Sequence, residues 1–187
     1  MKKILFALGA TALLAGPAAA QIPHITPFGF EARAGAAIPT GDLNDGAGPG
    51  LALSGSVTYH AIPLIGIYAG GSYNRFSVDD SDADLTDAGL DAGVRVGIPT
   101  PLIPIDPWIK AGVVVHQAKI SLGGASESAD WGTGYEVGGG LGFGFGPISV
   151  TPGISYVKYN STIDDGADED DVKMSYVKAD IGVRIRL

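Results

Sequence analysis

This chain has no cysteine, and no stretch beyond its first twenty residues is apolar enough to form a membrane-spanning helix. The lack of cysteine excludes disulfide bonds and thiolate metal sites. A spanning helix needs about 20 consecutive apolar residues, so helical transmembrane segments are excluded too. Amphipathic helices of useful length are also missing, since 29 glycines and 12 prolines interrupt the chain and both disfavour helix interiors. These absences leave an all-β protein.

Basic residues are scarce as well. The chain has 12 Lys and Arg against 20 Asp and Glu, a net charge of −8. Nucleic-acid binding needs clustered Lys and Arg to contact phosphates, so nucleic acid is excluded as a partner. With no cysteine to crosslink it, an exported domain of this kind must be stabilised by a packed core or by a membrane.

The first twenty residues have the features of a secretory signal. Lys2 and Lys3 form a positive start, residues 4–14 form a short apolar core, and Ala18 to Ala20 supply the small residues that signal peptidase requires. Gly16 and Pro17 interrupt the apolar run before it could span a bilayer. We therefore predict a cleaved signal peptide at 1–20 and a single domain at 21–187.

That domain is built from segments in which apolar or small residues alternate with polar ones. In the last segment, one set is Val177, Ala179, Ile181, Val183, Ile185 and Leu187, and the other includes Lys178, Asp180, Arg184 and Arg186. A period of two places the two sets on opposite faces of a strand. The pattern predicts eight strands, at 28–37, 51–60, 65–76, 87–98, 108–119, 133–145, 148–160 and 172–187. Pro152 makes the seventh strand the least regular.

The connections between these strands alternate in length and charge. Long acidic links follow the first, third, fifth and seventh strands, and short proline-rich links follow the others. Fifteen acids lie in the long links: Asp42, Asp45, Asp79, Asp80, Asp82, Asp84, Asp87, Glu127, Asp130, Asp164, Asp165, Asp168, Glu169, Asp170 and Asp171. Antiparallel strands with both termini at one end produce this rhythm, which is typical of an eight-stranded antiparallel up-and-down transmembrane β-barrel with short periplasmic turns and longer outer loops.

In these features, residues 21–187 resemble the small outer-membrane β-barrel family of the OmpA transmembrane domain, OmpX and the opacity proteins. The resemblance implies location in the cell outer membrane and insertion by the barrel-assembly machinery. It brings no catalytic motif with it, and architecture alone does not imply a function.

The alternation also predicts which ions face the lumen: Glu31, Arg33, Asp91, Arg95, Lys110, Glu136, Lys178, Asp180, Arg184 and Arg186. An eight-stranded barrel is just wide enough for side chains to fill, which favours a plug of ion pairs. Glycines on the inner face of residues 133–145 leave a narrow pore as the alternative. Serine at the inward Gly93 should be milder than arginine at the outward Leu90 or Val113.

Candidate chemical sites are few. The acidic runs 79–84 and 164–171 do not match the order of an EF-hand, so a solvated loop is favoured over a calcium site. Of His24, His60 and His116, only His116 lies near the outer end, and spacing assembles no Ser-His-acid set around it. An aromatic girdle accounts for Trp108, Tyr59, Tyr73, Tyr135, Phe145 and Tyr156. We predict no catalytic, cofactor-binding or metal-binding residues, and no cofactor.

The predicted function is structural or surface-interactive, through envelope integrity or adhesion by four acidic outer loops. The expected partners are outer-membrane lipid, lipopolysaccharide and host or surface ligands, and the expected state is a monomer. Two alternatives remain: a narrow porin-like channel for small solutes, and a secreted soluble β-sandwich.

Overall fold

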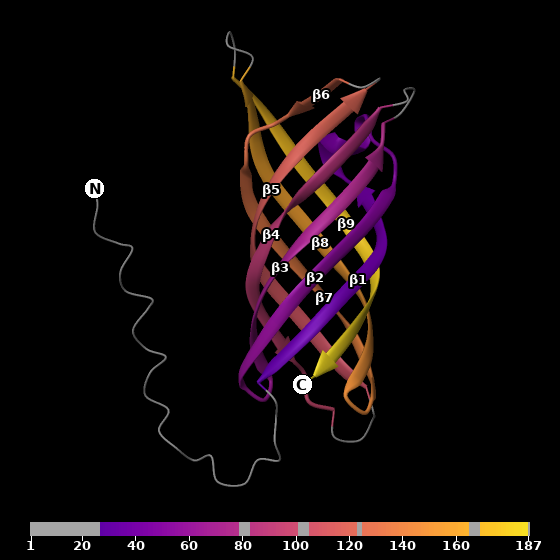
Figure 1. Cartoon of the computed structure of the whole chain (residues 1–187), viewed down its shortest axis with the longest axis vertical. Coiled ribbons are helices and arrows are strands. Elements are labelled where there is room, and N and C mark those ends of the chain that lie inside the picture. The colour runs from indigo at the N-terminus through magenta and orange to yellow at the C-terminus, as the bar shows by residue number, and fades with distance from the viewer. Residues whose placement is uncertain (1–26, 79–82, 101–104, 123–124, 165–168, 187) are drawn as a thin grey trace, which may run out of the picture.

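In the computed structural model, nearly all of the described chain is β-strand (Figure 1). The structure describes residues 27–78, 83–100, 105–122, 125–164 and 169–186, so the predicted signal peptide lies outside it. The elements are β1 (Phe28–Pro39), η1 (Gly41–Asp45), β2 (Gly50–Ile62), β3 (Ile65–Ser77), β4 (Asp84–Gly97), β5 (Asp106–Leu122), β6 (Ala125–Ser128), β7 (Gly132–Phe145), β8 (Ile148–Asp164) and β9 (Glu169–Arg186). No helix in these ranges is long and apolar enough to cross a membrane.

Eight long strands close into an antiparallel ring. The order β4-β3-β2-β1-β9-β8-β7-β5 is completed by pairing of β4 with β5. The first and last strands join in register, from Gly29 opposite Arg186 to Pro39 opposite Tyr176. Closure leaves no edge of unpaired backbone groups, which lipid could not satisfy. The predicted eight-stranded up-and-down barrel is confirmed. The soluble β-sandwich is wrong, because its two sheets would not join into one closed ring.

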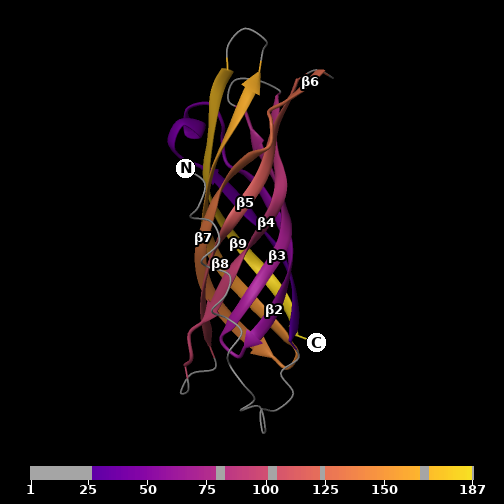
Figure 2. The ribbon, with the colours of Figure 1, turned by 90° about the vertical axis from the view of Figure 1, so that its left-hand side faces the viewer.

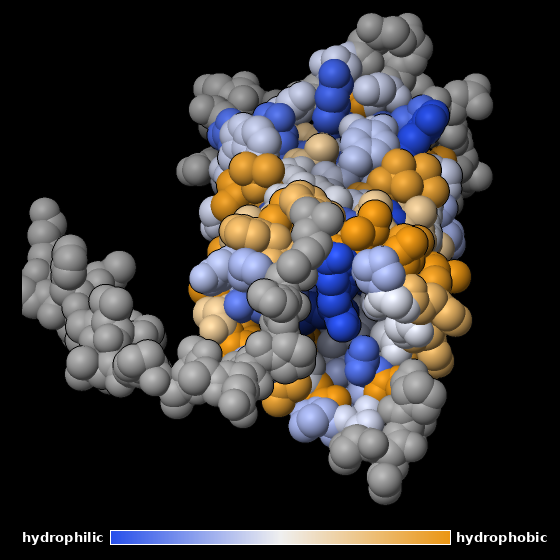
Figure 3. All heavy atoms as spheres, turned by 60° about the horizontal axis from the view of Figure 1, so that its bottom comes forward, coloured by the Kyte–Doolittle hydropathy of each residue, from blue (hydrophilic) through white to orange (hydrophobic). Residues whose placement is uncertain are grey.

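The outward face of the ring is apolar. Leu90, Val113 and Ile181 are each exposed over more than 60% of their surface. Large apolar residues are exposed on every long strand, although soluble monomers rarely expose contiguous apolar patches larger than a few hundred Å². In Figure 3 hydrophobic residues lie on the flanks of the wall, with hydrophilic residues at the end turned forward. This wall matches the lipid-facing band of a membrane barrel.

At the end with the long links, the strands extend further than the sequence predicts. The β8–β9 ladder continues to the pair Asp164–Glu169, beyond the predicted ends at 160 and 172. The short β6, which was not predicted, folds back on β5, with Lys119 opposite Ser128. Figure 2 shows both hairpins projecting from this end. The added segments, at 125–128, 161–164 and 169–171, are mostly polar on both faces, so alternation does not detect them.

The link after β1 folds onto the same end of the barrel. The backbone N–H of Thr40 donates to the carbonyl of Ser175 at 2.9 Å, and the Ser175 hydroxyl donates to the carbonyl of Thr40 at 2.6 Å. Ala47 is buried in an apolar cluster, with Leu43 packed against it. This link therefore packs against the end of the barrel, while its acids Asp42 and Asp45 stay exposed.

Pro152 lies within β8 without breaking it. It stands opposite Ile181 on the β9 side. On the β7 side, the pairing is interrupted between Gly140–Gly153 and Phe143–Val150, and it resumes in the same register. Proline has no N–H to donate to the ladder, so the interruption lies where the sequence predicts an irregularity.

Inward glycines let neighbouring strands and side chains approach closely. A Cβ on Gly134 would lie 2.0 Å from the carbonyl oxygen of Lys158, and one on Gly140 would lie 2.7 Å from the Trp108 ring. Both distances are shorter than real Cβ contacts. The space that these glycines leave is occupied by neighbouring atoms, so they do not open the pore that the sequence kept as an alternative.

Candidate functional site

The inward side chains of the barrel form layers along its axis. Nearest the end with the short turns, Glu31 of β1 accepts hydrogen bonds from three arginines on three strands. Arg95 Nη1 lies 2.7 Å and Arg184 Nη2 2.9 Å from Glu31 Oε2, while Arg33 and the Thr151 hydroxyl donate to Oε1. The four charged side chains are at least nine-tenths buried. One carboxylate therefore connects β1, β4 and β9.

Two further acids complete the middle of this network. Asp180 accepts from Arg33 Nε at 3.0 Å. Glu136 Oε1 accepts from Lys110 Nζ at 2.8 Å and from Lys178 Nζ at 2.9 Å. Buried ions that are paired in this way avoid the several kcal/mol that an isolated buried charge would cost. The ion-pair plug predicted from the alternation is thus present in the structure.

Nine of the ten predicted lumen ions lie inside. The exception is Arg186, whose side chain is 48% exposed at the mouth of the barrel and contacts Asp106 at 3.4 Å. Sequence reasoning missed Asp87, which it counted among the acids of the long links. Asp87 is fully buried. The spacing in the sequence could have placed Asp87 in the lumen. Asp87, Asp91 and Arg95 lie at intervals of four residues and therefore share one face of β4.

Asp87 is the acceptor at the centre of the next layer. Its carboxylate accepts from Asn74 Nδ2 at 3.0 Å, from the Tyr159 hydroxyl at 2.8 Å and from the Tyr176 hydroxyl. His116 Nδ1 lies 3.1 Å from the same carboxylate. The prediction of His116 as an inward, hydrogen-bonding histidine is confirmed. Four donors on one carboxylate hold β3, β5, β8 and β9 together.

Ser72, His116 and Asp87 form a Ser-His-Asp set that spacing alone did not reveal. Ser72 Oγ lies 3.2 Å from His116 Nε2. Asp91 Oδ1 lies closer to that nitrogen, at 2.9 Å. A catalytic histidine must accept the serine proton on this atom. Here each ring nitrogen lies within hydrogen-bond distance of a carboxylate, an arrangement that favours a proton on both nitrogens. The set is buried in the lumen, and its geometry is that of a structural ion cluster.

Trp108 does not belong to the aromatic girdle in which the sequence analysis placed it. It is only 4% exposed. The guanidinium of Arg95 lies 3.9 Å and that of Arg33 5.1 Å from its ring centroid. Trp108 shares the inward face of β5 with Lys110, two residues on, so alternation was the better guide than its position near a strand end. The other five girdle aromatics lie on the outer face, where Tyr135 and Tyr156 contact each other.

An apolar layer, which was not predicted, fills the lumen toward the long-link end. Its fully buried members are Phe76, Val114, Val157, Tyr159, Met174 and Tyr176. Val157 and Tyr159 both point inward with Ser155, so the alternation continues past Pro152. The layer shows that the inner face is sorted by depth, from ions near the short turns to apolar groups near the long links.

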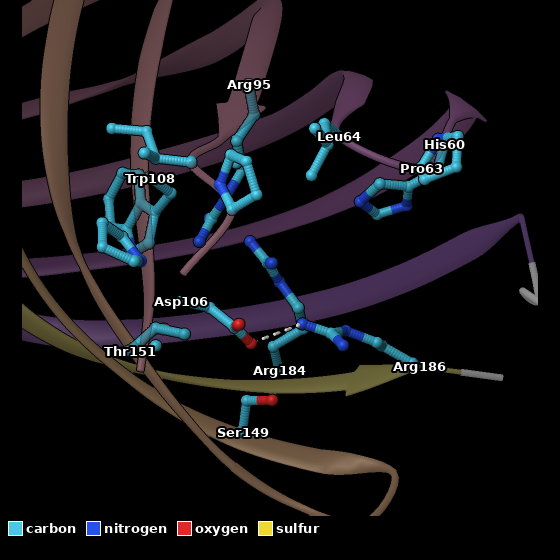
Figure 4. Close-up of a pocket in the computed structure, with 15 residues that line it drawn as sticks. His60, Pro63, Leu64, Arg95, Asp106, Trp108, Ser149, Thr151, Arg184 and Arg186 are labelled. Carbon is cyan, nitrogen blue, oxygen red and sulfur yellow. Dashed lines mark hydrogen bonds and ion pairs between the residues drawn. The ribbon is translucent and has the colours of Figure 1, made fainter. Parts of the chain in front are cut away.

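A cavity of about 240 Å³ lies at the short-turn end (Figure 4). Arg95, Trp108, Arg184 and Arg186 line it, with Asp106 at its rim. Among the described residues, no group of three or more His, Asp or Glu side chains is arranged so that it could hold a metal ion. Both acidic runs that were considered for calcium fall largely on 79–82 and 165–168, outside the described ranges.

A closed eight-stranded barrel with an apolar wall and an ion-filled lumen defines a class, the small outer-membrane β-barrels. The chain belongs to the outer membrane protein beta-barrel domain family, whose model matches residues 6–186. Its location is therefore the cell outer membrane. A comparison with curated protein sequences found no match.

Solved structures with the same fold support this assignment. Neisserial surface protein A is 19% identical, with a TM-score of 0.67 over 86% of this chain and 97% of that one. A major outer membrane protein from Thermus thermophilus is 14% identical, with a TM-score of 0.55 over 86% and 99%. OprG from Pseudomonas aeruginosa is 11% identical, with a TM-score of 0.52 over 87% and 98%. At these identities the likeness concerns the fold.

Proposed function

We propose that this protein has a structural or surface-interaction role in the outer membrane, carried by its wall and its outer loops. The observation that carries the proposal is the packed interior. Ion clusters around Glu31, Glu136 and Asp87 and an apolar layer occupy the lumen. A filled lumen argues against a channel and against an active site inside the barrel. It also gives a rigid base for the loops.

The long links supply the surface for contacts outside the cell. Asp42, Asp45 and Asp130 are exposed at that end, and the acidic stretches 79–82 and 165–168 belong to the same links. Carboxylates close together in sequence repel one another, and salt screens that repulsion. Loose association with divalent ions that bridge anionic lipopolysaccharide fits this arrangement, as does adhesion to a surface ligand. The proposed state in the membrane is a monomer.

The topology makes a first prediction. An epitope inserted at Gly166, between β8 and β9, should be labelled on intact cells, because the long links leave the barrel at the end opposite the paired termini of β1 and β9. Surface labelling followed by flow cytometry measures this. The matched control is the same epitope in the short turn at Gly146, which should be labelled only after permeabilisation. The reverse pattern would mean that the barrel is inverted.

A second prediction concerns the runner-up function, a narrow channel for small solutes. The observation in its favour is the cavity at the short-turn end. The apolar layer that includes Phe76 and Tyr176 fills the lumen beyond it, so we expect no steady conductance above leak in planar bilayers. Stable ion-selective steps would refute this. The variant Phe76→Ala, which removes part of the layer, serves as the comparison and should raise conductance if any path exists.

A non-enzymatic role is part of the proposal. The chain's family and its structural neighbours are outer-membrane barrels. Among the described residues, the Ser72, His116 and Asp87 set resembles a catalytic triad, but its essential nitrogen, Nε2 of His116, contacts Asp91. Asp91 therefore competes with Ser72 for this nitrogen, which argues against a catalytic role for the set.

A further inference from the structure

The cavity at the short-turn end is lined by more positive groups than its acids neutralise. Arg95, Arg184 and Arg186 line it together with Asp106. Arg33, Glu31 and Asp180 lie behind this lining and are joined to it by ion pairs. Four guanidinium groups and three carboxylates leave one positive charge in excess. The chain as a whole has a net charge of −8, so this local excess of base is a distinct feature of the inner mouth.

Hydrogen-bond donors are in excess as well. Arg95 Nη2 and Trp108 Nε1 are buried and have no hydrogen-bond partner among the described residues. Both residues are more than nine-tenths buried and both line the cavity. Glu31, the acid that Arg95 shares with Arg33 and Arg184, already accepts bonds on both of its oxygens. Buried donors without acceptors cost free energy unless a ligand or water satisfies them.

Asp106, the acid at the rim of the cavity, makes only a weak ion pair. Asp106 lies 3.4 Å from Arg186, and its side chain is 61% exposed. In Figure 4 the side chains of Arg95 and Arg184 point toward each other from opposite sides, and a dashed line joins Asp106 to Arg186. Glu31 already accepts from both arginines, and the N–H groups that they do not give to Glu31 favour a second anion beside them.

We propose that this cavity binds one small oxyanion, with a phosphate or carboxylate group held by Arg95, Arg184 and Arg186. A group with one negative charge balances the excess, and its several oxygens match the planar donors of arginine. The cavity's 240 Å³ is many times the roughly 10–15 Å³ that one water needs on the same measure, which is ample for a phosphate. The axis of the barrel leads to this site, so the anion enters from the compartment that the short turns face.

The test uses the refolded barrel in a phosphate-free, non-ionic detergent. Trp131, which is 58% exposed, is replaced by Phe so that Trp108 is the only tryptophan left. Inorganic phosphate is exchanged for chloride at constant ionic strength while the fluorescence of Trp108 is recorded. We expect a saturable change with a stoichiometry of one. A flat or non-saturating titration with a correctly folded barrel would overturn the proposal.

Charge variants distinguish a built site from a general charge effect. Arg186→Gln should weaken phosphate binding roughly fivefold to tenfold, because one charged donor is lost. Arg75→Gln, which removes an exposed arginine paired with Asp84 on the outer face near the other end, should leave the affinity unchanged. Asp106→Asn should tighten binding, an effect that a structural role for Asp106 would not produce. An equal loss of phosphate affinity in Arg186→Gln and Arg75→Gln would contradict the proposal.

Two competitors identify the source of the anion. Acetate tests the carboxylate, and a short-chain phosphatidylglycerol tests a lipid headgroup. Stronger competition by the lipid than by free phosphate would assign the site to a headgroup, and weaker competition would assign it to a soluble anion. The mobility difference between heated and unheated protein in electrophoresis shows that each variant is folded.

Discussion

Glu31→Gln is expected to destabilise the barrel by about 3–5 kcal/mol, the cost of removing one partner from a buried ion network. The substitution preserves the volume of the side chain and removes its charge. Arg95 and Arg184 would then face each other without a carboxylate between them, since both donate to Glu31 Oε2. Urea titrations of folding into lipid vesicles measure the free energy of unfolding.

The matched control is Asp84→Asn. Asp84 also pairs with an arginine, Arg75, but the two side chains are 41% and 55% exposed, so we expect little change because exposed ion pairs contribute little. The double variant Glu31→Gln with Arg184→Met should recover part of the loss, since it removes one of the arginines left unpaired. If Glu31→Gln proved as stable as the natural protein, the network would not contribute to the barrel's stability.

Replacing an apolar residue of the lipid-facing wall by arginine is the second change expected to lower the stability of the barrel strongly. Leu90 lies near the middle of β4 and Val113 near the middle of β5, and each is exposed over more than 60% of its surface. Either change to Arg should cost about 2–4 kcal/mol, because a charge at the bilayer midplane loses its hydration. The same vesicle titrations measure it.

The control on the same face is Gln117→Arg. Gln117 lies four residues beyond Val113, toward the end of β5, and its side-chain amide donates to the carbonyl of Ala129 at 3.0 Å. An arginine there can donate in the same way and reaches the interface, where the cost falls to about 0–1 kcal/mol. Similar losses at Val113 and Gln117 would contradict the placement of the membrane.

Serine at Gly93 is not a mild control, although the sequence predicts that it should be. A Cβ on Gly93 would lie 2.2 Å from the carbonyl oxygen of Ala111. The alternation correctly places Gly93 on the inward face, but it says nothing of how closely the neighbouring strand approaches. That approach follows from the tight curvature of an eight-stranded ring.

The alternation by itself determined the strands, the closed barrel and the facing of most side chains. A period of two is a property of the extended backbone, so it holds wherever one face meets lipid and the other does not. Asp87 and Trp108 illustrate this: both lie on the inward face that the period assigns, and both were misplaced when position near a strand end was used instead. The extensions of β8 and β9 and the short β6 lie where neither face meets lipid, so no period marked them.

Only the tertiary structure decided which inward groups meet. Glu31 and Arg95 are 64 residues apart, and Glu31 and Arg184 are 153 apart. Glu31 stands directly opposite Arg184 because the first and last strands pair when the barrel closes. Glu31 and Arg95 lie on β1 and β4, which are not neighbours in the ring, and they meet across the narrow lumen because of how the strands tilt. The same geometry gathers Ser72, His116 and Asp87, sorts apolar groups toward one end and leaves unpaired donors at the other. Local sequence carries no record of these distances, because they are set by the shear of the whole ring.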